Sequence, residues 1–169
     1  MQHETSLDSS VCALSGVGPK LTEYLKRLDV TRIGDLLFHL PIRYQDRTRL
    51  ISIGDLEAYR ETQFEGTIQT AQIVYGRRRT LVCRVSDGTG VVTLRFFHFS
   101  RSQKNRLKIG QRIRCFGEIR LGSKSMEVIH PECRIVDDGK PMPLSLELTP
   151  IYPTTDGLHQ ARLRKLTDQ

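Results

Sequence analysis

The sequence predicts a mainly β fold, a five-stranded Greek-key barrel preceded by a small helical segment, on three observations. Five β-rich segments with turn signals between them occupy the middle of the chain, about residues 55–137. One helical interruption, residues 100–110, lies between the third and the fourth of these segments. Two stretches with apolar residues at helical spacing precede residue 50. Five strands with a helix after the third is the order of an OB-fold.

The helical segment is expected to hold two helices, because apolar residues recur at helical spacing over residues 21–28 and again over 33–40. Pro19 fits the first turn of the first helix, where a missing N–H costs no hydrogen bond. Thr31 is expected to cap the second helix, and Pro41 to end it.

The barrel strands are expected at residues 64–74, 80–88, 91–99, 111–122 and 125–136. In the third of them, "VVTLRFFHF", successive side chains point to opposite faces. The face that carries Arg95 must be solvated, so Phe96 belongs to the core with Val92 and Leu94, while Phe97 and Phe99 are displayed.

The fourth strand is expected to repeat this pattern. Its inward side chains are predicted to be Ile113, Cys115 and Ile119, and its outward side chains Arg112, Arg114, Phe116 and Arg120. Arginines interleaved with aromatic rings form a platform on which bases stack while phosphates pair with guanidinium groups. Phe97 and Phe99 are therefore candidate stacking residues. Packing of the outward rings against a helix or the N-terminal segment is the alternative.

Charge is concentrated in the barrel region. The chain has a formal net charge of +7, and residues 60–134 hold 15 Lys or Arg against 6 Asp or Glu. A basic middle on a nearly neutral frame favours a polyanion partner over a merely soluble basic surface.

The candidate phosphate contacts lie on the hairpin "YGRRRT", the outward strand faces, the helix and the loop "LGSK". They are Arg77, Arg78, Arg79, Arg95, Arg101, Lys104, Arg112, Arg114 and Lys124. Both loops belong to the pair that commonly grips oligonucleotides in OB-folds. Three adjacent arginines repel one another unless an anion spreads their charge, although a solvated loop is the plainer interpretation.

The loop "SGVGPK" before the first helix is a weaker candidate of helix-hairpin-helix type. Gly16 and Gly18 would let backbone N–H groups approach a phosphate, and Lys20 would add a positive charge. Glycines also serve plain turns, so this short motif leaves both interpretations open.

No metal site, cofactor or catalytic residue is expected in this chain. The four cysteines are widely spaced without a C-x-x-C couple, and "HPEC" has no second couple to complete a zinc site. The sequence contains no G-x-x-x-x-G-K-[ST], HExxH or GxSxG motif. The chain by itself is therefore predicted to be a binding module, not an enzyme.

Three segments are expected along the chain: a helical segment at residues 1–54, the barrel at 55–137 and a connector at 138–169. The connector holds four of the seven prolines and ends in the opening turns of a helix, which is expected to lead into further domains. No apolar run approaches the roughly 20 residues of a membrane span, and no signal peptide is evident. A cytoplasmic monomer is expected.

The blocks "LSGVGPKLTEYLKRLDVTRIGDLLFHLPIRYQDRT" and "LTPIYPTTDGLHQARLRKLTDQ", placed around an OB-fold, resemble the N-terminal part of the RecG family, the bacterial ATP-dependent DNA helicases of branched DNA. The combination of "DLLFHLPIRYQDRT" with "TPIYPTT" is specific, whereas "GVG" alone is not. The resemblance covers nearly the whole chain from Leu14.

This resemblance implies a wedge domain that binds replication forks and Holliday junctions in DNA repair and recombination. It implies that Phe97 stacks on bases where the strands part, and leaves Phe99 a doubtful counterpart of a second stacking ring. It also implies motor domains in the parent protein, which would use ATP and Mg²⁺. Two other functions stay open: a general single-stranded nucleic-acid binder, and an OB-fold that docks an acidic peptide such as the tail of a single-stranded-DNA-binding protein.

Overall fold

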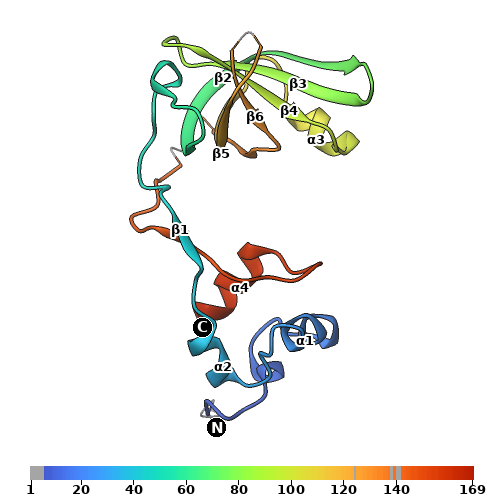
Figure 1. The fold of residues 1–169 in the computed structure, drawn as a ribbon, viewed down its shortest axis with the longest axis vertical. Coiled ribbons are helices and arrows are strands. Elements are labelled where there is room, and N and C mark those ends of the chain that lie inside the picture. Colours follow the sequence, from blue (N-terminus) through green and yellow to red (C-terminus); the bar gives the residue numbers. More distant parts are fainter. Residues whose placement is uncertain (1–5, 124, 138, 140–141) are drawn as a thin grey trace. The chain divides into compact units, whose positions relative to one another are not determined.

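The computed structural model describes residues 6–123, 125–137, 139 and 142–169, and the chain forms two compact units. Residues 1–45 and 149–169 make up one unit, and residues 46–148 the other. The fold is mainly β, as predicted, and Figure 1 shows its strands and helices. The three-segment division at residues 54 and 137 stays a prediction.

The larger unit contains the predicted barrel. Its elements are η2 (Ile53–Asp55), β2 (Glu61–Tyr75), β3 (Arg79–Ser86), β4 (Val91–Phe96), α3 (Arg101–Arg106), β5 (Arg112–Leu121), β6 (Met126–Ile129) and β7 (Glu132–Ile135). β2 pairs antiparallel with both β3 and β5, while β4 pairs parallel with β6. Since β6 also pairs with β5, the sheet closes on itself in the OB-fold order.

The predicted fifth strand is two short strands, because the chain turns between them. β6 pairs with β4 and β5, whereas β7 pairs with β5 alone. His130, between the two, has a φ of 49°. This left-handed conformation cannot continue an extended strand, so the ladder is interrupted there.

The barrel core confirms the alternation predicted for two strands. The inward side chains of β4 and β5 are all buried: Val92, Leu94, Phe96, Ile113, Cys115 and Ile119. They form one apolar cluster with Phe64 and Cys83. Burial raises the pKa of the Cys83 thiol to about 11, as expected for a cysteine that serves as a small core residue.

A glycine in β2 allows close packing inside this barrel. A Cβ on Gly66 would lie 2.7 Å from Val85 Cγ1 and 2.9 Å from both Ile53 Cδ1 and the Ser86 carbonyl oxygen. Real side chains do not approach so closely, so any larger residue here must displace the η2 segment or β3.

Gly66→Ala is therefore expected to lower the free energy of unfolding by about 1–3 kcal/mol, through overpacking. Urea unfolding followed by circular dichroism measures this. Gly76→Ala is the matched control, because a Cβ at Gly76 would meet nothing within 4 Å. Equal losses in the two variants would contradict the packing argument.

Arg112 and Arg120 of β5 are exposed as predicted, but the middle of this outer face is covered. The prediction that Arg114 and Phe116 face solvent is therefore wrong. Their exposed fractions are 9% and 5%. The guanidinium of Arg47 lies over the Phe116 ring, 4.0 Å from its centroid. The Arg114 guanidinium donates to the carbonyl oxygens of Met142 and Pro143, at 2.6 and 2.9 Å. Segments on either side of the barrel in sequence thus cover this face.

The smaller unit joins the two ends of the chain. Its elements are η1 (Val11–Ala13), α1 (Pro19–Lys26), α2 (Ile33–Phe38), β1 (Arg43–Gln45), β8 (Thr149–Ile151) and α4 (Gln160–Thr167). β1 and β8 form an antiparallel pair that the sequence analysis did not predict. Val11, Leu25 and Leu163 are fully buried in its core. The C-terminal helix therefore packs with the N-terminal ones.

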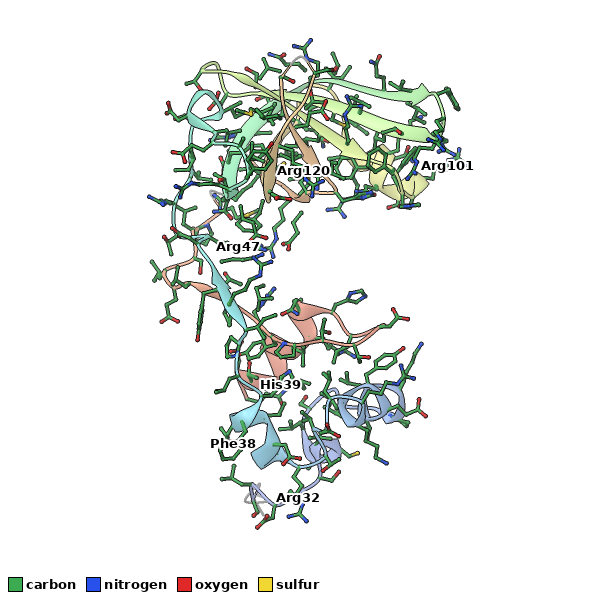
Figure 2. The ribbon with its side chains drawn as sticks, viewed as in Figure 1. Arg32, Phe38, His39, Arg47, Arg101 and Arg120 are labelled. Atoms are coloured by element: carbon green, nitrogen blue, oxygen red, sulfur yellow. The ribbon has the colours of Figure 1, made fainter. Side chains whose placement is uncertain are left out.

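The second helix is shorter than predicted, and its N-terminus is capped differently. α2 ends at Phe38, and Phe38 is exposed (Figure 2). Thr31 does not cap it; instead the Asp35 carboxylate accepts hydrogen bonds from the backbone N–H groups of Arg32 and Thr31, both at 2.8 Å. The Arg32 N–H is the main cause that holds the pKa of Asp35 below its ordinary value.

Candidate nucleic-acid interface

The β2–β3 hairpin carries three consecutive arginines at its tip. Tyr75 pairs with Arg79 in the last rung of the ladder, so residues 76–78 form the turn. Arg77, Arg78 and Arg79 are exposed, and no carboxylate of the described residues forms an ion pair with them. This leaves an uncompensated positive charge at one end of the barrel.

Helix α3 carries two more of the candidate phosphate contacts. In the view of Figures 1 and 2, α3 and Arg101 lie toward the same end of the barrel as the tip of the β2–β3 hairpin. The Arg79 guanidinium covers Phe99, two residues before α3. Arg101 and Lys104 are exposed and, within the described part of the chain, unpaired with acids. The Ser100 hydroxyl caps α3 by accepting a hydrogen bond from the Gln103 N–H at 3.0 Å.

Phe97 lies in the loop between β4 and α3, because β4 ends one residue before it. The ring is half-buried. The Arg78 guanidinium lies over it, 5.3 Å from the centroid, and the His130 ring meets it edge-on at 5.7 Å. One aromatic ring is thus held beneath a cation from the basic hairpin, a pairing that suits both a base and a phosphate.

Phe99 is less displayed than the alternation argument predicted. Its ring is half-buried and packs against the barrel core. The Arg79 guanidinium covers it at 4.5 Å from the centroid. Strand alternation applies to neither Phe97 nor Phe99, because β4 ends at Phe96. The packing alternative describes the Phe99 ring better.

Two other candidate arginines are exposed in part but already paired. The Arg95 guanidinium donates to both oxygens of Glu127, at 2.7 and 2.8 Å. This hydrogen bond is the main cause that raises the pKa of Arg95. Arg112 lies 2.9 Å from a Glu65 oxygen. A phosphate would have to compete with these carboxylates, so both residues are weaker candidates than the hairpin arginines.

Arg114 does not line an exposed surface. Its Nε donates to the same Glu65 carboxylate at 2.6 Å, and both side chains are about nine-tenths buried. Phosphate contact by Arg114 is not compatible with this burial. Lys124, the last barrel candidate, lies outside the described residues.

The loop before α1 has the expected helix N-terminus but few free amides. Gly16 has a φ of 80°, and Gly18 is the N-cap residue of α1. The N–H groups of Leu21 and Thr22 both donate to the Gly18 carbonyl, and Pro19 has no N–H. The exposed Lys20 belongs to the smaller unit, whereas the hairpin arginines belong to the barrel unit.

Two residues of the interface were not predicted from the sequence. Tyr75 is 78% exposed beside the arginine turn, and an exposed aromatic residue next to "GRRR" could have marked it. His130 contacts Phe97, although 33 positions separate them. No local pattern connects residues so far apart in sequence.

The described residues include no group of three or more His, Cys, Asp or Glu side chains placed to hold a metal ion. In the same part of the chain, no helix is long and apolar enough to cross a bilayer.

Comparison with known proteins assigns the chain to a family. A family model described as the RecG wedge domain matches residues 11–169. The ATP-dependent DNA helicase RecG of Haemophilus influenzae is 46% identical over 157 residues, which are 93% of this chain and 23% of that protein. The ATP-dependent DNA helicase RecG of Escherichia coli K12 is 45% identical over 157 residues, which again are 93% of this chain and 23% of that protein. The chain thus spans less than a quarter of the length of these relatives.

A solved structure of RecG bound to a three-way DNA junction resembles the whole chain in fold. Its TM-score is 0.79 at 23% identity, with 100% of this chain and 23% of that chain covered. At this identity the likeness concerns the fold alone, whereas the family model and the closer relatives carry the assignment. The chain belongs to the RecG wedge domain family.

Proposed function

We propose that this chain binds branched DNA as the wedge of an ATP-dependent helicase. Its parent protein would hydrolyse ATP with Mg²⁺ in motor domains outside this chain, while the barrel holds the branch point. The names of the relatives and the family assignment support this. The substrates would be replication forks and Holliday junctions, met during repair and recombination in the cytoplasm.

One observation carries the proposal: the Phe97 ring lies under the guanidinium of Arg78, which belongs to the uncompensated basic hairpin. The cations would contact phosphates without sequence preference. The Phe97 ring would stack on the terminal base pair where the strands part. Affinity then comes from charge, and preference for a branch comes from the ring.

The strand separation follows from this arrangement. A motor that pulls duplex toward the barrel would force the two strands to opposite sides of the stacked ring. Phosphate contacts along the β2–β3 hairpin would guide one of them away. The released strands could then anneal with their complements, which is fork reversal.

The test is a salt titration of binding by the 169-residue chain to a three-way fork, a plain duplex and a single strand of equal length. The fork is expected to bind most tightly at every salt concentration. All three affinities should fall with salt as counterions are released. Equal affinities for fork, duplex and single strand would show that the basic face binds polyanions in general, and would overturn the proposal.

Arg77→Gln is expected to weaken fork and duplex binding alike and to lower the slope of log K against log salt by about 1, the loss of one phosphate contact. Fluorescence anisotropy at several salt concentrations measures both. Arg60→Gln is the control, because it removes the same charge from a residue that pairs with Glu57 at 2.7 Å. If Arg77→Gln weakened binding to the fork alone, Arg77 would contact the branch point and would not be a general phosphate contact.

A further inference from the structure

We propose that His130 is a positioning residue, which holds the loop of Phe97 in the conformation that presents the ring at a branch point. This inference rests on the proposed function and extends it to a residue that does not itself stack. Three successive residues, Phe96, Phe97 and His98, contact the His130 ring. His130 is exposed, so these contacts do not depend on a buried core position.

The first contact is a hydrogen bond that replaces the end of the strand ladder. The Phe97 N–H donates to His130 Nε2 at 3.2 Å. Phe97 is the first residue beyond β4, and its N–H is bound by a side chain instead of a neighbouring strand. Because Nε2 accepts this bond, the proton of the neutral imidazole lies on Nδ1.

The second group of contacts orients the rings. His130 meets Phe97 edge-on at 5.7 Å and 63°, and meets the buried Phe96 edge-on at 6.1 Å and 88°. The His98 ring stacks on the imidazole, at 5.9 Å and 18°. The imidazole therefore links the half-buried ring of Phe97 to the buried ring of Phe96.

The backbone of His130 is bound into the barrel at the same point. Its N–H donates to the Arg95 carbonyl at 2.9 Å, in the strand that ends just before Phe97. Its φ of 49° is uncommon for a residue with a Cβ, and histidine tolerates it better than most. This left-handed conformation breaks the fifth strand and lets the ring reach back to Phe97. Uncommon backbone conformations of this kind persist in proteins at places where they orient a functional side chain.

The test compares His130→Ala with His130→Gln in the 169-residue chain. In both variants the left-handed backbone at φ 49° costs a similar free energy. Only the glutamine side-chain carbonyl can accept a hydrogen bond from the Phe97 N–H. His130→Ala is expected to lower the preference for fork over duplex by about three- to tenfold, the effect of one hydrogen bond. His130→Gln should keep most of the preference, and duplex affinity should be unchanged in both.

A second readout needs no DNA. Hydrogen exchange of the Phe97 amide, followed by NMR, is expected to be at least several-fold faster in His130→Ala than in the wild type or in His130→Gln. Unchanged exchange would overturn the positioning role, whatever the DNA measurements show. Absence of any fork preference in the wild type would instead overturn the proposed function, so the two failures are distinguishable.

Two further variants separate positioning from direct DNA contact and from stability. In a Phe97→Ala background, His130→Ala should cost no further fork preference; a full additional loss would show that His130 touches DNA itself and would overturn the proposal. His130→Gly removes the hydrogen-bond acceptor, but it also removes the free-energy cost of a positive φ. Its melting temperature should therefore be unchanged, while its preference for fork over duplex should be lost. His98→Ala removes a similar ring without that hydrogen bond and should have the smaller effect.

Discussion

Replacement of Phe97 by alanine is expected to reduce the preference of this chain for a fork over a plain duplex by about 5- to 150-fold. The estimate is the stacking energy of one base on an aromatic ring, about 1–3 kcal/mol. Duplex affinity and its salt dependence should change little, because the hairpin arginines stay in place. Fluorescence anisotropy with fork and duplex side by side measures the ratio.

Two variants control this experiment. Phe97→Tyr keeps a flat ring and should keep most of the fork preference. Phe99→Ala removes the ring that packs on the core, so it should lower the melting temperature more and the fork preference less. If Phe97→Ala keeps the full preference for fork over duplex, the ring does not act at the branch point. A role of Phe97 in docking another protein then becomes the better interpretation.

Replacement of Arg114 by alanine is expected to lower the free energy of unfolding by about 3 kcal/mol, the lower end of the range for breaking a buried ion pair. The Glu65 side chain is 9% exposed and would lose its buried partner, although Arg112 remains. The carbonyl oxygens of Met142 and Pro143 would also lose their donor. Urea unfolding followed by circular dichroism measures the loss.

Arg112→Ala is the matched control, since Arg112 pairs with the same carboxylate but its side chain is 53% exposed. Solvent screens such a pair, so its loss should cost less than about 1 kcal/mol. Equal costs for the two arginines would contradict the assignment of Arg114 as the buried partner. A salt slope of DNA binding that changes only in Arg112→Ala would place Arg112 among the phosphate contacts.

The structural role of Arg114 explains why the barrel has fewer available cations than its sequence suggests. Arg95, Arg112 and Arg114 are bound by acids of neighbouring strands. Among the candidate phosphate contacts of the barrel that the structure describes, those of the hairpin and α3 have no acidic partner. The proposed interface is therefore one end of the barrel and not its whole outward surface.

The sequence by itself determined the order of the barrel strands, the place of the helix and the inward faces of β4 and β5. Each of these depends on local signals: period-2 alternation, turn residues and helical spacing. Phe96 is buried as alternation requires, and the arginine hairpin is exposed at the tip of β2 and β3. Local patterns also located the family blocks at both ends of the chain.

Only the tertiary structure decided which outward residues stay outward. Arg114 and Phe116 are covered by segments that contain Arg47 and residues 142–143, far from them in sequence. The pairing of β1 with β8 and the contact of His130 with Phe97 likewise join distant positions. Alternation tells which side chains share a face of a strand, but what covers that face depends on where the rest of the chain folds.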